Sequence, residues 1–414
     1  MQQPKQHHFV PTAANERIVT LDIIRAFALF GILLVNMRFF STPAIQADSI
    51  GISFSGNLLD TISTWFIFIF AEIKFVSMFS MLFGIGFLLF MERGEEKGIY
   101  VKKFFKRRLL VLLMFGLIHI FFFWYGDILT FYALLGFILL FMKDKQLRYL
   151  KRAAIITWSI VVTFFMLMAS LMFVAQIETT PEQLALMENE VVRIADVYSQ
   201  GTFVEILQQR INDISIIAVG NIFLFGVILT MFFFGMYFWR TGIFTNTAEN
   251  LNRIRRIAKR MLMVGVLGLI LASLGMIFID GANSPWYFVK YGGLFISGPS
   301  ISIFYVMSIL LLLQNKDRLA KSTTYLQPVG KMALSNYLMQ TLLCTTIFYS
   351  YGLGLFGSIG PFRGILITIG IYSLQIVYSY FWMKRFRFGP MEWLWRRLTY
   401  GKNAVKVQPL QKAQ

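Results

Sequence analysis

The sequence predicts an all-α polytopic membrane protein of about ten transmembrane helices plus one re-entrant or interfacial helix, with both termini in the cytoplasm. Hydrophobic residues make up 57% of the 414 residues and charged residues only 14%, whereas a soluble domain carries about 25% charged residues. The chain also contains 44 phenylalanines and has a mean hydropathy of +0.64. These values exclude a soluble enzyme and a disordered chain, and the single cysteine, Cys344, excludes an internal disulfide.

Nine stretches meet or approach the requirement for a membrane-crossing helix, which is about 20 mostly apolar residues for about 30 Å of hydrocarbon. In chain order they are Ile18–Phe40, Phe104–Trp124, Ile128–Met142, Ala153–Ala175, Ile214–Trp239, Met261–Ile279, Tyr291–Leu313, Met332–Ser350 and Gly364–Met383. The stretch Ile128–Met142 is short, which favours a helix near the bundle centre or a hairpin with its neighbour.

The apolar segment Leu58–Met91 allows two interpretations. It is too long for one span, and Glu72 and Lys74 interrupt it. Either it crosses the membrane twice, or one span over about Phe75–Met91 follows a re-entrant or interfacial helix over about Leu58–Ala71. The loop charges favour a single crossing, because two crossings would put strongly basic loops outside.

The basic residues indicate the orientation, since Lys and Arg collect in cytoplasmic loops. With the N-terminus inside and ten crossings, 32 of the 39 Lys and Arg residues lie in inner segments. The outer loops then keep only Arg193, Arg210, Lys290 and Arg363. The formal net charge of +18 therefore reflects membrane topology, and no nucleic-acid partner is expected.

The chain is expected to form one integral-membrane domain over residues 18–400. Residues 1–17 form a polar cytoplasmic tail without the features of a cleavable signal peptide, and residues 401–414 form a second polar cytoplasmic tail. Within the domain, residues 176–212 form an acidic outer loop that is predicted to contain a small amphipathic helix.

Polar residues in the first span are candidates for function, because an ionisable residue at bilayer depth costs on the order of 2.5–3.5 kcal/mol. Asp22 and Arg25 lie three residues apart and can pair on one helix face, while Asn36 and Arg38 follow towards the outer end. The alternative for Asp22 and Arg25 is a simple ion pair at the inner helix end, where an arginine side chain reaches the interface.

His119 is the only histidine outside the N-terminal tail, and Asp127 follows eight residues later at the break between two spans. A neutral histidine whose ring is oriented by a carboxylate is a common general-base arrangement. The alternative is a buried histidine bonded to a backbone carbonyl, with Asp127 capping the next helix. Both interpretations stay open.

Asn336 and Gln340 share one face of their span, and Cys344 continues this face. Hydrogen bonding between helices and lining of a substrate cavity are the two interpretations. The sequence contains no phosphate-binding loop, H-E-x-x-H motif or dinucleotide fingerprint, and no metal site is expected.

Three stretches together resemble a known family. They are Glu16–Asn36, Arg107–Ala133 with His119 and Gly126-Asp127, and the C-terminal pair Pro328–Gln340 and Phe388–Arg396. Their order resembles the YeiB-like family of bacterial integral-membrane proteins, a domain of unknown function, over nearly the whole chain. The resemblance implies a multi-pass protein of the bacterial inner (plasma) membrane.

A more distant resemblance carries a functional implication. The pattern Leu21-Asp22-x-x-Arg25, with Asn36 eleven residues further on, is similar to the first span of transmembrane acyltransferases. The O-acetylating members of that superfamily carry a histidine where this chain has Asn36, so His119 on another helix is the residue that would have to substitute. The resemblance implies acyl transfer from cytoplasmic acyl-CoA to a small-molecule, glycan or lipid acceptor at the outer face.

On this hypothesis His119 is the general base, Asp127 orients its ring, and Asn36 donates a hydrogen bond to the developing oxyanion. The inner Arg25, Arg107 and Arg108 would bind the acyl-CoA phosphates. The full set of candidate substrate-binding residues is Asp22, Arg25, Arg38, Arg107, Arg108, Asn336 and Gln340. The alternatives are a transporter or exporter, which short and interrupted spans favour, and a non-catalytic lipid-binding protein. The lipid bilayer is the expected partner, and a homodimer is left open.

Overall fold

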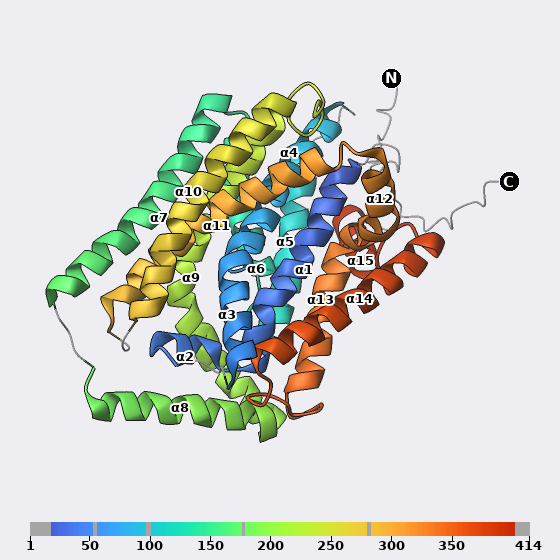
Figure 1. Cartoon of the computed structure of the whole chain (residues 1–414). Helices are drawn as coiled ribbons and strands as arrows, with labels where there is room; N and C mark the ends of the chain where they lie inside the picture. Colours follow the sequence, from blue (N-terminus) through green and yellow to red (C-terminus); the bar gives the residue numbers. More distant parts are fainter. Residues whose placement is uncertain (1–17, 53–55, 97–100, 176–178, 280–282, 402–414) are drawn as a thin grey trace.

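The computed structural model describes residues 18–52, 56–96, 101–175, 179–279 and 283–401. Within these residues the chain is built of α-helices, and no strand is present (Figure 1). The predicted tails, residues 1–17 and 401–414, lie outside the described residues except for Gly401. The predicted all-α fold is therefore confirmed for the described part of the chain.

Each of the nine predicted spans overlaps a helix of the described chain. These helices are α1 (Val19–Ser41), α5 (Val101–Phe122), α6 (Leu129–Met142), α7 (Leu147–Ala175), α9 (Phe203–Arg240), α10 (Leu251–Phe278), α11 (Pro285–Leu312), α13 (Ala333–Phe348) and α14 (Pro361–Arg385). The other described helices are α2 (Ala44–Ser49), α3 (Leu58–Phe70), α4 (Lys74–Glu96), α8 (Pro181–Gln200), α12 (Lys316–Lys331) and α15 (Pro390–Tyr400).

Seven segments of the described chain are long and apolar enough to cross a membrane, so the protein is a multi-pass membrane protein. They are Val19–Ser41, Leu58–Glu96, Leu147–Ala175, Ile222–Arg240, Leu251–Phe278, Pro285–Leu312 and Pro361–Arg385. The predicted spans in α5, α6 and α13 are not among them. α6 and α13 have only 14 and 16 residues, and α5 carries several lysine and arginine residues in its first two turns.

The segment Leu58–Glu96 forms a helix that is broken in the middle. Figure 1 shows α3 in the lower half of the bundle and α4 in the upper half. The break at Ala71–Ile73 includes Ile73 with a φ of 64°, a conformation that is rare for a β-branched residue. The buried Lys74 donates from Nζ to the Phe68 carbonyl oxygen at 2.7 Å. This bond satisfies a backbone group that the break frees inside the bundle.

The helix predicted over Leu58–Ala71 is present as α3, and α4 follows it after the break, so the segment Leu58–Glu96 is one broken helix. The two halves follow one another lengthwise along the bundle (Figure 1). The polar residues that interrupt the apolar segment, Glu72 and Lys74, mark the position of the break.

The two ends of the bundle differ in the elements that cover them. At one end, called the α12 end below, α12 packs so closely on α1 that a Cβ on Gly330 would lie 1.8 Å from the Asp22 carbonyl oxygen. At the opposite end, the α8 end, α8 lies across the bundle near α2 (Figure 1). The span of α1 is 56% buried and that of α7 only 17%, so α1 is central and α7 exposes its surface to lipid.

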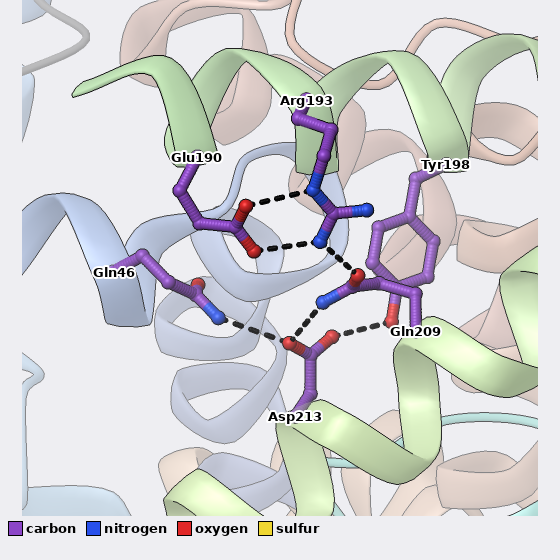
Figure 2. A network of polar contacts seen from close by, with 6 residues as sticks. All are labelled: Gln46, Glu190, Arg193, Tyr198, Gln209 and Asp213. Atoms are coloured by element: carbon purple, nitrogen blue, oxygen red, sulfur yellow. Dashed lines mark hydrogen bonds and ion pairs between the residues drawn. The ribbon is translucent and has the colours of Figure 1, made fainter. Parts of the chain in front are cut away.

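A network of polar contacts holds α8 against the bundle (Figure 2). Asp213 in α9 accepts hydrogen bonds from the Tyr198 hydroxyl at 2.6 Å, from Gln46 Nε2 at 2.9 Å and from Gln209 Nε2 at 3.0 Å. Arg193 extends the network by donating to Gln209. Burial raises the pKa of the Asp213 carboxyl, although these hydrogen bonds oppose the shift. α8 lies within residues 176–212, where the sequence predicts a helix.

Replacing Asp213 with alanine should loosen α8 from the bundle. The change leaves the buried Tyr198 hydroxyl and two glutamine amides without their acceptor, which costs about 1–3 kcal/mol. Hydrogen–deuterium exchange in the second half of α8 should therefore rise by roughly 5- to 150-fold. Glu188→Ala is the matched control, because Glu188 is exposed on the same helix. Equal exchange rates in the two variants would contradict the prediction.

Candidate functional site

A cavity of about 300 Å³ lies among the helices at the α12 end. Its wall is formed by α1, α4, α5 and α6 together with the adjoining ends of α12, α13 and α15. The charged lining residues all lie towards the ends of their helices, and the lining residues deeper in the bundle are apolar or aromatic. Ligand pockets in proteins usually have volumes of about 300–1,000 Å³, so this cavity is at the small end of that range.

Basic residues dominate the charged part of this cavity. Its five basic lining side chains are Arg25, Arg93, Arg108, Lys331 and Arg396. The two acidic lining side chains, Asp22 and Glu392, both bind groups of the protein itself. The excess of positive charge in a partly enclosed space attracts an anionic ligand.

Two of these arginines are held in place by specific partners. Arg25 Nη1 pairs with Asp22 Oδ1 at 2.6 Å, and the Arg25 side chain keeps 27% of its surface exposed. The Arg108 guanidinium stacks on the ring of Trp395 in α15, 3.8 Å from the ring centroid. Trp395 Nε1 in turn donates to the Arg108 carbonyl oxygen at 3.0 Å. A planar guanidinium held in this way has the geometry that binds phosphate oxygens in pairs.

Glu392 caps α13 and thereby attaches α15 to the cavity wall. Its carboxylate accepts hydrogen bonds from the Leu334 N–H at 2.7 Å, from the Ser335 N–H at 3.1 Å and from Ser335 Oγ at 2.5 Å. Burial raises the pKa of Glu392, and these hydrogen bonds oppose the shift. The positive end of the α13 dipole also stabilises the carboxylate, so Glu392 is held at the start of α13.

Apolar side chains form the deeper part of the cavity. They include Leu29, Ile32, Phe79, Phe83, Leu112 and Leu129. Tyr132 and Tyr337 also line it, and the Tyr132 hydroxyl is bonded to Ser80 Oγ at 2.8 Å. A hydrocarbon chain gains about 25 cal/mol for each Å² that such a surface buries. The cavity therefore fits an amphiphilic anion, with its charged group at the helix ends and its apolar part inside.

His119 and Asp127 meet, but His119 does not line the cavity. Asp127 Oδ1 contacts His119 Nδ1 at 2.9 Å, and Thr341 Oγ1 of α13 contacts His119 Nε2 at 2.9 Å. An imidazole that donates its Nδ1–H to a carboxylate presents Nε2 as an acceptor for a hydroxyl. The His119 side chain is 2% exposed, and Tyr337 packs against it with ring centroids 5.3 Å apart.

Asp127 also caps α6, which is the alternative role that its position predicts. Its second oxygen, Oδ2, accepts a hydrogen bond from the Thr130 N–H at 2.7 Å. One carboxylate therefore both orients the histidine and starts the helix. Through Thr341, the same contacts join the hairpin of α5 and α6 to α13.

Two candidates from the first span lie away from the cavity. Asn36 is half-buried, is not part of the cavity wall, and makes no side-chain hydrogen bond to His119 among the described residues. Arg38 lines a different cavity at the α8 end, where it pairs with Asp48. The geometry therefore does not support the predicted oxyanion role of Asn36 or a contact between Arg38 and an anion at the α12 end.

Three further candidates also lie outside the cavity wall. Arg107 is exposed and does not line the cavity, because neighbouring residues of a helix point in different directions. Gln340 Nε2 donates to Gln375 Oε1 at 2.9 Å, and Asn336 Nδ2 donates to Ser379 Oγ at 2.9 Å. Asn336 and Gln340 therefore join α13 to α14 by hydrogen bonds between helices, which is the first of the two interpretations of these residues.

Sequence reasoning missed the part of the cavity that α12 and α15 supply. Lys331, Glu392, Trp395 and Arg396 line the cavity, but no spacing rule connects them with the first span. The available signal was the stretch Phe388–Arg396, which combines acidic, aromatic and basic residues in a short segment after the last span.

Comparisons with known proteins identify relatives without an assigned activity. Residues 238–402 match the family described as a protein of unknown function (DUF418). The chain is 34% identical to the uncharacterized protein YxaH of Bacillus subtilis, over 97% of this chain and 98% of the relative. It is 29% identical to the uncharacterized protein YeiB of Escherichia coli, over 93% of this chain and 96% of the relative. No solved structure matches the chain.

Proposed function

The chain belongs to the YeiB-like (DUF418) family of bacterial membrane proteins, and we propose that it is a membrane acyltransferase. It takes an acyl group from acyl-CoA on the cytoplasmic side of the inner membrane. The group passes to a hydroxyl or amine of a small-molecule, glycan or lipid acceptor at the outer face. The cavity at the α12 end, basic where the helices end and apolar inside, is the observation that carries this proposal.

The proposal requires the α12 end to face the cytoplasm, with ten crossings and both termini on that side. Contacts between connections of the chain support this arrangement. Lys143 pairs with Glu95, and Arg240 donates to the carbonyl oxygens of Lys143 and Lys145. The last turn of α4, the connection after α6 and the last turn of α9 therefore meet at one end, and the preference of basic segments for the cytoplasm supports placing this end inside.

The size of the cavity indicates how acyl-CoA would bind. A volume of about 300 Å³ holds only part of so large a ligand. The acyl chain and the adjoining part of the pantetheine arm would enter the apolar interior. The phosphates would stay at the helix ends, where Arg25, Arg108 and Arg396 offer charge-assisted hydrogen bonds.

Transfer also needs a base, and His119 is the candidate. Its Nε2 takes the proton of the acceptor hydroxyl or amine while the acceptor atom attacks the thioester carbonyl. The C–S bond then breaks, and the CoA thiolate takes the proton back from the imidazolium. The Thr341 hydroxyl occupies the place that the acceptor hydroxyl would take, and the Tyr337 side chain must turn aside to connect this place with the cavity.

Transport is the second candidate function, and the break between α3 and α4 favours it. Broken helices near substrate sites are characteristic of transporters, and the residue at this break, Glu72, lines a second cavity at the opposite end. A transporter would move its substrate in sealed vesicles without consuming acyl-CoA. A protein that only binds lipid would show neither activity.

Binding of palmitoyl-CoA to the purified protein tests the proposed function. We expect Arg108→Gln to weaken binding by about 10- to 100-fold, because it removes charge-assisted hydrogen bonds to phosphate. Arg107→Gln is the matched control, since Arg107 is the preceding residue, has the same charge and lies outside the cavity wall. Its affinity should stay within about threefold of the wild type, measured by isothermal titration calorimetry.

Two results would overturn the proposed function. The first is a wild-type protein that does not bind palmitoyl-CoA at all. The second is an equal loss of affinity in the Arg107 and Arg108 variants, because the attraction would then be a general property of a basic surface. Palmitate without CoA serves as an additional ligand, and its affinity should fall less in Arg108→Gln, because one carboxylate accepts fewer charge-assisted hydrogen bonds than the phosphates of CoA.

A further inference from the structure

A second cavity, of about 180 Å³, lies at the α8 end of the bundle. α1, the break between α3 and α4, α11 and the start of α14 all contribute to its wall. Its charged lining residues are Arg38, Asp48, Glu72 and Lys290. Charged side chains around a cavity within a membrane bundle indicate a site for a polar ligand.

One pair of these charges is satisfied within the protein. Arg38 Nη2 pairs with Asp48 Oδ1, which joins the end of α1 to α2. Because each side chain neutralises the other, this pair forms a polar part of the wall that requires no charged ligand. The two remaining charges, Glu72 and Lys290, are different.

Lys290 is a buried cation without an anionic partner in the described chain. Lys290 is only 5% exposed. Among the described residues no carboxylate lies within 4.0 Å of its Nζ, and the recorded contact of this atom is with the Tyr291 ring, 5.4 Å from the centroid. A buried ammonium is costly unless it is paired and hydrogen-bonded. Since Lys290 lines the cavity, an anionic group in the cavity is the partner that it lacks.

Glu72 presents the opposite charge to the same cavity. It lies in the break between α3 and α4, is half-buried, and forms no ion pair within the part of the chain that the structure describes. Because Glu72 and Lys290 do not pair with each other, one ligand can place a group against each of them. A carboxylate at such a position accepts hydrogen bonds from an ammonium group.

We infer that the cavity at the α8 end binds a small zwitterion. Its anionic oxygens contact Lys290, and its protonated amine contacts Glu72. A phosphodiester joined to ethanolamine is the simplest chemistry of this kind, either free or as a lipid headgroup. The inference goes beyond the proposed function and stands whether or not the protein transfers acyl groups. The two cavities are separate, because no residue lines both of them.

Binding of glycerophosphoethanolamine to the purified wild-type protein, in nanodiscs of phosphatidylglycerol, tests this inference. Glycerol 3-phosphate offers only the anion and ethanolamine only the cation. We expect the zwitterion to bind at least about tenfold more tightly than either, because each of the single-charge ligands leaves either Glu72 or Lys290 unpaired. Wild-type protein that fails to bind the zwitterion at millimolar concentration overturns the inference.

Two variants locate the binding. Lys290→Met and Glu72→Gln should each weaken glycerophosphoethanolamine binding by about 10- to 100-fold. The control is Arg363→Gln, which removes an exposed positive charge at the start of α14 near the same end and should stay within about twofold of the wild type. If Lys290→Met does not fold, Glu72→Gln still decides the question, because its side chain is only half-buried and keeps its shape.

The two proposals fail separately. Palmitoyl-CoA binding by Lys290→Met and Glu72→Gln should equal that of the wild type, since neither residue lines the cavity at the α12 end. Native mass spectrometry from nanodiscs that contain phosphatidylethanolamine distinguishes the sources of the ligand. If the site binds a lipid headgroup, the wild-type protein retains this lipid and both variants lose it. Unchanged zwitterion affinity in both variants would overturn the inference, whatever palmitoyl-CoA binding shows.

Discussion

His119→Gln is expected to lower acyl-CoA turnover by about 10²- to 10⁴-fold, the usual contribution of a general base, while palmitoyl-CoA binding stays unchanged. Glutamine offers a donor for Asp127 and an acceptor for Thr341, so it preserves the contacts of the buried imidazole. It cannot accept a proton at neutral pH. Turnover is measured as release of the CoA thiol by the protein in proteoliposomes.

A second variant separates a base from a nucleophile. In the structure, Thr341, His119 and Asp127 stand in a row in which a hydroxyl, an imidazole and a carboxylate contact one another, an order that also activates nucleophiles. On the proposed mechanism Thr341 only holds the place of the acceptor. Thr341→Val should therefore keep at least about a third of the wild-type turnover, whereas a nucleophilic Thr341 would lose nearly all of it.

The outcome for His119→Gln also decides between catalysis and packing. If this variant turns over acyl-CoA within about threefold of the wild type, the imidazole serves only to join the α5–α6 hairpin to α13. His119→Ala would not decide this, because it leaves Asp127 and Thr341 unpaired in a buried position and lowers stability as well.

The apolar spans were predictable from the sequence because lipid imposes one requirement on every helix that crosses it. The stretch Ile18–Phe40 became α1 (Val19–Ser41), and the stretch Gly364–Met383 became α14 (Pro361–Arg385). Helices that extend beyond the hydrocarbon were predicted too short. α9 begins at Phe203 rather than Ile214, because its first turns are polar and a Thr202–Glu205 capping box starts them.

The candidate site was only partly predictable, because a cavity depends on which helices become neighbours. Local spacing was enough for the Asp22–Arg25 pair, which needs only one helix. It also suggested the contact of His119 with Asp127 across one short connection. The stacking of Arg108 on Trp395 joins residues that are 287 positions apart, and nothing in either segment alone indicates the other.

The same dependence on helix neighbours makes the contact between α4 and α9 sensitive to mutation. A Cβ on Gly84 would lie 2.1 Å from the Phe232 carbonyl oxygen, and a Cβ on Gly235 would lie 2.1 Å from the Met81 carbonyl oxygen. The two backbones touch at both points, as small residues allow in membrane bundles. Neither position offers a flexible side chain that could move aside.

Gly84→Leu is therefore expected to prevent recovery of folded protein, and Gly84→Ala to cost about 3 kcal/mol, the upper part of the range for overpacking. The thermal unfolding midpoint of Gly84→Ala in detergent should fall by roughly 5 °C or more. Gly370→Ala is the control, because an added Cβ there meets nothing within 4 Å on the exposed face of α14. In that helix alanine should be neutral or stabilise by about 0.5–1 kcal/mol. Equal midpoints for the two alanine variants would mean that α4 and α9 do not touch at Gly84.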